Sequence, residues 1–238
     1  MKAMNIGEVC TAVGGSILGG SKEEVITSIT TDSRKIEKGC LFIPLAGERF
    51  DGHDFINQAF EKGAVCCLSH KDIEAKGTII KVKDTRKALL DLASYYRGLF
   101  DIKVCAITGS VGKTTTKDMI YSVLSRKYNT LKTQGNFNNH IGVPLTLLRL
   151  TAEHDIAVVE MGANHPGEID FLVHIAEPDY GLITNVGKAH LEGFGSFEGV
   201  IRTKGELYDY LRTKPESMVF IHNDNPYLNR IAQGLNLI

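Results

Sequence analysis

The second half of the chain alternates apolar stretches with amphipathic ones. The runs KVCAIT, DIAVVE, YGLITNV and SMVFIHND are apolar enough for buried strands, and a stretch with helical spacing follows each of them. Buried strands that alternate with amphipathic helices predict a parallel, doubly wound α/β sheet. Ligands of such sheets bind beyond the carboxyl ends of the strands, so the loops after Thr108, Glu160 and Asn185 are the candidate site positions.

The first hundred residues have a different pattern of shorter elements. Strands are expected in VITSITTDS, CLFIPLA, AVCCLSH and TIIKV, and amphipathic helices in HDFINQAFEKGA and DTRKALLDLASYYRGLF. A glycine at position 98 and the change of pattern are the only signs of a boundary. The chain is therefore expected to be α/β, with a small mixed α/β domain at residues 1–99 followed by a parallel-sheet domain at residues 100–238.

One predicted helix, FEGVIRTKGELYDYL at residues 197–211, carries a lysine among its apolar positions. Its apolar stripe consists of Phe197, Val200, Ile201, Leu207, Tyr208 and Leu211, with Lys204 in the middle. Arg202, Glu206 and Asp209 fall on the other side and are expected to face solvent. Lys204 either lifts its ammonium group to solvent or points into a site, where desolvation would lower its pKa.

A glycine-bearing loop, TGSVGKTTT at residues 108–116, lies between a predicted strand and a predicted helix. Glycines allow backbone N–H groups to surround phosphate oxygens at a helix N-terminus. The strict Walker pattern needs glycine where this chain has Ile107, so the loop is a shortened variant, with Lys113 aimed at terminal phosphates and Thr114 at Mg²⁺. The alternative is a glycine turn with a surface lysine. The expected nucleotide contacts are Gly109, Ser110, Val111, Gly112, Lys113, Thr114 and Thr115.

Polar groups follow the neighbouring strands as well. Glu160 directly follows an apolar strand, from where a carboxylate either ligates nucleotide-bound Mg²⁺ or remains a solvated loop residue. His190 lies in the loop after the next strand; taken alone it is an ordinary surface or core histidine, since Mg²⁺ prefers oxygen ligands. The stretch TQGNFNNHIGVP includes Asn138 and Asn139, whose amides either recognise a polar substrate or form turns and caps.

Composition removes several classes of function. The formal net charge is −1 without a basic tract, which gives no reason to expect nucleic-acid binding. No apolar run is long enough to span a bilayer, and the N-terminal apolar stretch, interrupted by Glu8, is too short for a signal peptide. The five cysteines lack C-x-x-C spacing, which disfavours a disulfide framework or zinc site. We expect a cytoplasmic protein, without membrane insertion, that acts as a monomer.

Four stretches together resemble the Mur ligases of peptidoglycan synthesis. They are ITGSVGKTTT, TQGNFNNHIGVPLTLL, VVEMGANHPGEI and ITNVGKAHLEGFGSFEGVIRTKGEL. The N-terminal TTDSRKIEKGCLFIPLAGERFDGHDFINQAFEKGA resembles the domain with which this family holds a uridine nucleotide. GNFNNHIGVPLTLL and EMGANHPGEI favour the branch that adds D-alanyl-D-alanine over the preceding branch, which adds a diamino acid.

The resemblance implies a reaction and a set of site residues. The reaction is ATP-dependent amide ligation through an acyl phosphate, with UDP-N-acetylmuramoyl-tripeptide and D-alanyl-D-alanine as substrates and ATP and Mg²⁺ as cofactors. The family pattern implies that the catalytic residues are Lys113, Glu160, His190 and Lys204. It implies that the metal ligands are Thr114, Glu160, His190 and a carbamate on Lys204. It also implies uridine contacts at Ser33, Arg34, Arg49 and Phe50, and muramoyl contacts at Asn138 and Asn139.

The family's chains are longer, with a C-terminal domain after the ATPase domain. The resemblance therefore implies that this chain ends inside the ATPase domain and is inactive alone. Alternatives are a diamino-acid ligase of the same family, a folylpolyglutamate synthase-like ligase, or a P-loop protein that binds nucleotide without ligase chemistry.

Overall fold

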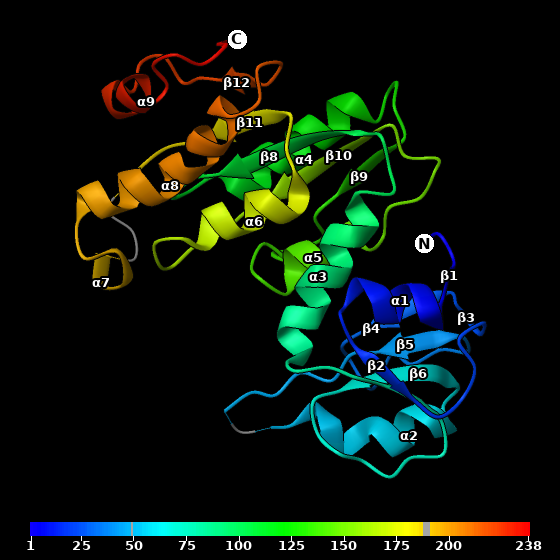
Figure 1. Cartoon of the computed structure of the whole chain (residues 1–238). Coiled ribbons are helices and arrows are strands. Elements are labelled where there is room, and N and C mark those ends of the chain that lie inside the picture. The colour runs from blue at the N-terminus through cyan, green and yellow to red at the C-terminus, as the bar shows by residue number, and fades with distance from the viewer. Residues whose placement is uncertain (49, 188–190) are drawn as a thin grey trace. The chain divides into compact units, whose positions relative to one another are not determined.

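The chain divides into two compact units, Met1–Tyr96 and Arg97–Ile238. The computed structural model describes residues 1–48, 50–187 and 191–238 (Figure 1). Arg97 ends helix α3 (Thr85–Arg97), and its guanidinium group donates to the carbonyls of Phe100, Ile102 and Ala176. These hydrogen bonds attach Arg97 to the second unit, just before the boundary expected at residues 99 and 100.

The first unit is built on a mixed five-stranded sheet. Its order is β2-β7-β6-β5-β4, with parallel pairing throughout except for the antiparallel edge strand β2. The strands are β2 (Ser16–Leu18), β4 (Ser28–Thr30), β5 (Cys40–Phe42), β6 (Ala64–Ser69) and β7 (Thr78–Lys81). A separate antiparallel pair joins β1 (Met4–Asn5) to β3 (Val25–Ile26).

Helices cover this sheet on both sides. Figure 1 shows α1 (Ile6–Ala12) and α2 (Ile56–Glu61) on opposite sides of it. The stretch expected to form one helix begins as a 3₁₀ turn, η1 (Gly52–Phe55), before α2. Ile56 and Ala59 of α2 are fully buried and pack with Phe42, Cys67 and Ile79 of the strands, which is why the apolar face of this helix points inward.

The second unit contains the expected parallel sheet. Its strand order is β12-β11-β8-β10-β9, and every pair is parallel. The strands are β8 (Lys103–Thr108), β9 (Thr130–Lys132), β10 (Ile156–Glu160), β11 (Tyr180–Ile183) and β12 (Met218–Phe220). Strands β8 and β10 lie side by side, so Thr108 and Glu160 end at the same edge of the sheet.

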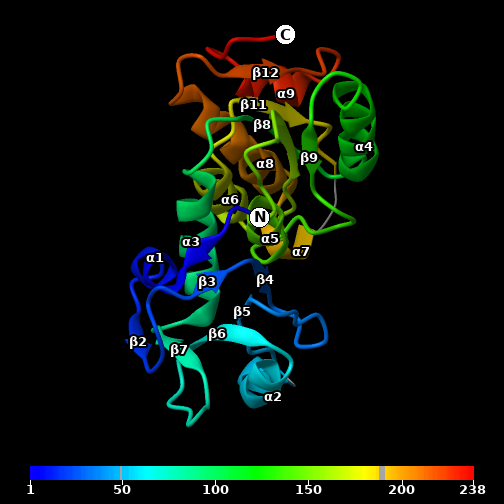
Figure 2. The same ribbon diagram turned by 90° about the vertical axis from the view of Figure 1, so that its right-hand side faces the viewer.

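Right-handed crossovers place the helices of this unit on both faces of the sheet. The chain moves one way from β8 to β9 through α4 and the other way from β10 to β11 through α6, so α4 and α6 cover opposite faces (Figure 2). The helices are α4 (Lys113–Leu124), α5 (Gly142–Leu147), α6 (Glu168–Ala176), α7 (Leu191–Phe194), α8 (Phe197–Arg212) and α9 (Pro226–Ile231). Among the residues placed by the structure, no helix has the length and apolar character needed to cross a membrane.

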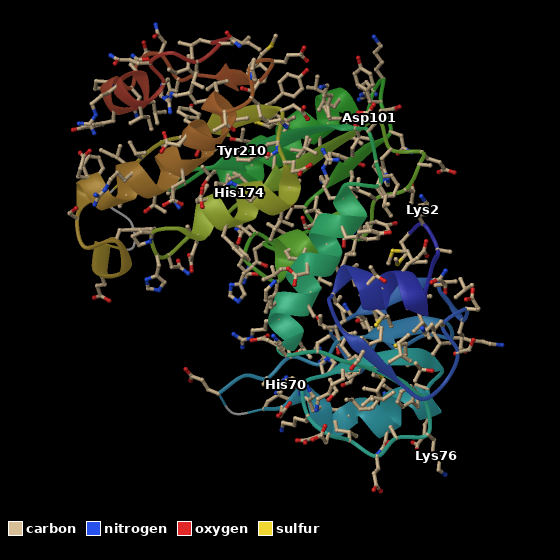
Figure 3. All side chains as sticks on the ribbon, in the orientation of Figure 1. Lys2, His70, Lys76, Asp101, His174 and Tyr210 are labelled. Carbon is tan, nitrogen blue, oxygen red and sulfur yellow. The ribbon has the colours of Figure 1, made fainter. Side chains whose placement is uncertain are left out.

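Helices α6 and α8 are joined by specific side chains. The rings of His174 and Tyr210 pack edge to face with centroids 5.2 Å apart (Figure 3). The Glu206 carboxylate of α8 accepts hydrogen bonds from the backbone N–H groups of Gly167 and Asp170 at the start of α6, at 2.7 and 2.9 Å. The expectation that Glu206 only faces solvent is therefore wrong, whereas Arg202 and Asp209 are exposed.

Candidate nucleotide and metal site

A cavity of about 560 Å³ lies at the carboxyl ends of the strands of the second unit. It is lined by residues that come from separate parts of the sequence. They are Gly109, Ser110 and Lys113 of the glycine-bearing loop, residues 138–140, residues from 162 to 172, Phe194 and Lys204. Six of the residues singled out in the sequence therefore meet in one hollow: Gly109, Ser110, Lys113, Asn138, Asn139 and Lys204.

The glycine-bearing loop has a backbone that requires glycine. Gly109 has φ +141° and Gly112 has φ +82°, in the region that side chains disfavour. A Cβ on Gly109 would also lie 2.1 Å from Thr184 Oγ1. The loop is braced by Asn185, whose backbone carbonyl accepts from Ser110 N–H and whose Oδ1 accepts from Val111 N–H, both at 3.1 Å. Thr114 and Thr115 follow in the exposed first turn of α4.

The Lys113 side chain folds back over its own loop. Its Nζ donates to the carbonyls of Gly109 and Ser110, at 2.8 and 3.3 Å. Burial lowers the pKa of this ammonium group, and the nearby Glu160 carboxylate partly offsets the effect. Carbonyls are weaker partners for an ammonium group than phosphate oxygens, so this lysine is available to an anion that enters the loop.

Glu160 is the central carboxylate of the site. Its side chain is 1% exposed, and its Oε1 accepts from Thr114 Oγ1 at 3.2 Å and from Asn138 Nδ2 at 2.8 Å. Its Oε2 has no hydrogen-bond partner but lies 3.5 Å from Lys117 Nζ, with which it forms an ion pair. Removing a carboxylate from water is costly unless a cation compensates for it, so a positive charge is needed at this position.

The residues at Glu160 fit a magnesium ion. The Glu160 carboxylate, whose Oε1 lies 3.2 Å from the Thr114 hydroxyl, and this hydroxyl are hard oxygen donors of the kind that Mg²⁺ prefers, while Lys117 pairs with Oε2. Within residues 1–48, 50–187 and 191–238, no group of three or more histidine, cysteine, aspartate and glutamate side chains could hold a metal ion. His190, expected as a metal ligand, lies outside the residues that the structure describes.

Lys204 is buried. The residue is 3% exposed, and its Nζ donates to the carbonyl of Ala163 at 3.3 Å and lies 5.2 Å from the centroid of the Phe194 ring. Burial, followed by repulsion from Lys113, lowers the pKa of Lys204 to about 8. The ammonium group does not reach solvent as a snorkelling lysine would, and the neutral amine is far more populated near neutral pH than in an ordinary lysine, although the protonated form still predominates.

The two asparagines have different roles. Besides its contact with Glu160, Asn138 accepts from Gly162 N–H through its backbone carbonyl, at 2.7 Å. Asn139 Oδ1 accepts from the N–H groups of Ile141 and Gly142 and so caps the start of α5, which is the local role that asparagines often have. Both residues line the cavity.

The candidate uridine contacts all belong to the first unit. The Arg34 guanidinium group is largely exposed and forms a bidentate pair with Asp32 at 2.8 Å. The Ser33 carbonyl accepts from Lys62 Nζ at 3.0 Å, and Phe50 is 55% exposed. Arg49 lies outside the residues that the structure describes.

Lys117 and Asn185 were missed as site residues in the sequence. Lys117 could have been found by the signal that singled out Lys204, since Lys117, Ile120 and Leu124 recur at helical spacing and face the sheet. The bracing role of Asn185 depends on the close approach of the loops after β8 and β11, which no local pattern predicts.

Known proteins are similar to this chain in sequence and in structure. The family described as Mur ligase middle domain matches residues 107–237, and the one described as Mur ligase family, catalytic domain, matches residues 25–97. The UDP-N-acetylmuramoyl-tripeptide–D-alanyl-D-alanine ligase of Escherichia coli (strain K12) is 44% identical over 231 residues, which cover 96% of this chain and 50% of that protein.

Two solved structures resemble the chain. MurF from Acinetobacter baumannii matches with a TM-score of 0.92 at 38% identity, and the match covers 100% of this chain and 53% of the MurF chain. MurF ligase from Thermotoga maritima in complex with ADP has a TM-score of 0.81 at 35% identity and covers 89% of this chain and 49% of that one. The chain thus spans about half the length of the curated relatives it matches. It belongs to the Mur ligase family.

Proposed function

We propose that the chain is the nucleotide- and UDP-substrate-binding part of an ATP-dependent ligase of peptidoglycan precursor synthesis. The complete enzyme would join D-alanyl-D-alanine to UDP-N-acetylmuramoyl-tripeptide, as the name of the E. coli relative states for that protein. The observation that carries the proposal is that the glycine-bearing loop (residues 108–116, hereafter the P-loop), Asn138 and Lys204 line one cavity. Glu160 lies beside them and contacts Thr114 and Asn138. The enzyme is expected to be a cytoplasmic monomer that uses ATP and Mg²⁺.

The proposed reaction has two steps. The carboxylate of the UDP-linked peptide attacks the γ-phosphate of ATP and gives an acyl phosphate and ADP; the amine of D-alanyl-D-alanine then displaces phosphate and forms the amide. The P-loop amides orient the phosphates, and Lys113 exchanges its carbonyl partners for phosphate oxygens. Thr114 and Glu160 would hold Mg²⁺, which neutralises charge on the transferred phosphoryl group when bound.

Lys204 completes the proposed site by a covalent change. Its neutral amine adds CO₂ and loses a proton, which replaces a cation with an anionic carbamate able to ligate Mg²⁺. The depressed pKa of Lys204 supports this step because only the neutral amine reacts. His190 would ligate a second Mg²⁺. Ser33, Arg34, Arg49 and Phe50 are proposed to contact the uridine moiety, and Asn138 and Asn139 the muramoyl part.

The test is an ADP-release assay on the complete protein. We expect ADP formation over many turnovers only when UDP-N-acetylmuramoyl-tripeptide and D-alanyl-D-alanine are both present. Equal activity with a diamino acid as the amine would contradict the assignment within the family. Nucleotide hydrolysis that no UDP-muramoyl peptide affects would point instead to a P-loop protein without ligase chemistry.

A further inference from the structure

Helix α4 buries a second lysine beside the proposed metal site. Lys117 is 1% exposed and lies one helical turn beyond Lys113, on the side of α4 that faces the sheet. Its Nζ lies 3.5 Å from Glu160 Oε2 and 3.8 Å from Asp118 Oδ1, and it donates to the Gly135 carbonyl at 3.0 Å. A buried ammonium group is retained only where anionic or carbonyl partners replace its lost hydration, and Lys117 has both.

The carbonyl partner of Lys117 belongs to the segment that lines the cavity. Gly135 has φ +52°, a left-handed conformation that turns the chain after β9. The same segment supplies Asn138, whose amide donates to Glu160 Oε1 at 2.8 Å. Its first residue, Thr133, accepts from Glu160 N–H through its hydroxyl at 3.0 Å. Segment 133–140 therefore contacts Glu160 at its backbone and at its side chain, and Lys117 contacts both the segment and Glu160.

Lys117 and Asn138 hold different oxygens of the same carboxylate. Asn138 and Thr114 contact Oε1, whereas Lys117 supplies the only ion pair of Oε2 within the described parts of the chain. Without Lys117, Oε2 would be a buried anionic oxygen with neither a hydrogen bond nor an ion-pair partner among the described residues. The cation thus fixes which way the carboxylate plane faces before any ligand arrives.

We propose that Lys117 is a positioning residue that serves as the internal counter-charge of Glu160 and ties this carboxylate to segment 133–140. The ion pair keeps Glu160 oriented towards Thr114, and the hydrogen bond to Gly135 fixes the turn from which Asn138 projects. The Glu160 carboxylate and segment 133–140 consequently move together. The role of Glu160 as a metal ligand rests on the proposed function, but the pairing itself does not.

A double-mutant cycle on the 238-residue chain, in EDTA and without nucleotide, tests the pairing. Lys117→Met keeps an unbranched side chain, one atom shorter, and removes its charge; we expect the midpoint of thermal unfolding to fall by roughly 10 °C, because Glu160 is left without its ion-pair partner. Lys117→Met combined with Glu160→Gln should recover most of that loss, since no buried charge then lacks a partner. Additive losses from the two single changes would overturn the proposal.

Lys132→Met is the matched control. Lys132 pairs with Asp118 at 2.8 Å and is 30% exposed, so this change removes the same charge nearby without touching Glu160. We expect a shift of only about 2 °C and no coupling to Glu160→Gln. If Lys117→Met does not fold, the double variant decides: the proposal requires it to fold, and its failure would count against the pairing.

Hydrogen exchange tests the link to the cavity segment. The backbone amides of Phe137 and Asn138, which donate to the Gln134 and Asn136 carbonyls, should exchange at least about tenfold faster in Lys117→Met than in the wild type, while Lys132→Met leaves them unchanged. Lys117→Gln keeps a donor for the Gly135 carbonyl and should restore part of the protection. Unchanged exchange in Lys117→Met would refute the link. None of these measurements uses ATP or a ligase substrate. They can therefore refute the Lys117–Glu160 pairing without affecting the ligase assignment, and the ADP-release assay can refute the ligase assignment without affecting the pairing.

Discussion

At the residue scale, Lys117 and Lys204 show that equally buried lysines can have different chemistry. Lys117 has the Glu160 carboxylate as a partner, whereas Lys204 has the Ala163 carbonyl and the Phe194 ring. Burial removes the hydration of the Lys204 ammonium group, Lys113 repels it, and a carbonyl and an aromatic ring compensate for this less than a carboxylate would. The pKa of Lys204 accordingly falls to about 8, which makes it the lysine suited to react as a neutral amine.

The depressed pKa of Lys204 predicts a change of stability with pH. Between pH 8 and the unfolded-state pKa near 10.5, the unfolded chain binds a proton at this position and the folded chain does not, so stability rises with pH. Compared with Lys204→Met, the wild type should gain roughly 2 kcal/mol of unfolding free energy from pH 8 to pH 10. The measurement is urea unfolding of both proteins at each pH, with bicarbonate excluded.

The comparison with Lys204→Met removes the contribution of other groups that titrate in this range. Tyrosines and cysteines ionise equally in both proteins, so their effects cancel in the difference. A difference that does not vary with pH would mean that Lys204 keeps an ordinary pKa in the folded chain. It would also remove the physical support for carbamate formation at this position.

At the element scale, the placement of Lys204 depends on how α8 packs on α6. Ser196 caps α8 by accepting from Gly199 N–H at 3.0 Å, and Glu206 accepts from the first N–H groups of α6. A carboxylate at a helix N-terminus also interacts favourably with the helix dipole. Burial raises the pKa of Glu206, and the hydrogen bonds from α6 oppose that shift.

Glu206→Ala should weaken this joint. We expect the free energy of unfolding to fall by about 1–2 kcal/mol, because two helix N–H groups lose their acceptor. Asp209→Ala on the same helix is the matched control, since Asp209 is exposed and pairs only with Arg212 among the described residues; its loss should be about 0.5 kcal/mol or less. Denaturant unfolding of both variants measures the difference, and equal losses would contradict a capping role.

The elements differ in how well the sequence predicted them. Strands β8 and β10 are continuous apolar runs because both of their faces are covered, and such runs are recognisable without a structure. Strand β9 was missed because it is only three residues long, too short for a recognisable apolar run. The inward direction of Glu206 could not be inferred, since a carboxylate opposite an apolar stripe has the same pattern whether it meets water or another helix.

The site also combines features that a local sequence pattern predicts with contacts between distant segments that it does not predict. Gly109, Gly112, Lys113 and Thr114 are adjacent in the sequence, so their loop was predicted from its local pattern. The contacts of Glu160 with Thr114, Lys117 and Asn138 join segments that only the parallel sheet brings together. Parallel topology predicts that these segments meet at one edge, but not which side chain occupies each oxygen of the carboxylate.

At the scale of the whole molecule, the candidate ligand contacts are divided between the two units. The cavity beside the P-loop is lined entirely by residues of Arg97–Ile238. Ser33, Arg34, Arg49 and Phe50, the proposed uridine contacts, all belong to Met1–Tyr96. Each unit has its own sheet and its own buried core, so each can provide a binding site on its own scaffold.

This division predicts that two nucleotides protect different parts of one chain. Hydrogen exchange on the intact 238-residue chain should show slower exchange in residues 97–238 when ADP and Mg²⁺ are added, and in residues 1–96 when UDP is added. The first effect depends on phosphate binding by the P-loop, so Lys113→Ala should abolish it and leave the UDP effect intact. Arg34→Ala should have the opposite result: it should abolish the UDP effect and leave the ADP effect intact. Its exposed guanidinium group pairs only with Asp32 among the described residues. Loss of both effects in Lys113→Ala, or protection of residues 1–96 by ADP, would show that the two nucleotides share a site, and the assignment of uridine binding to the first unit would then be wrong.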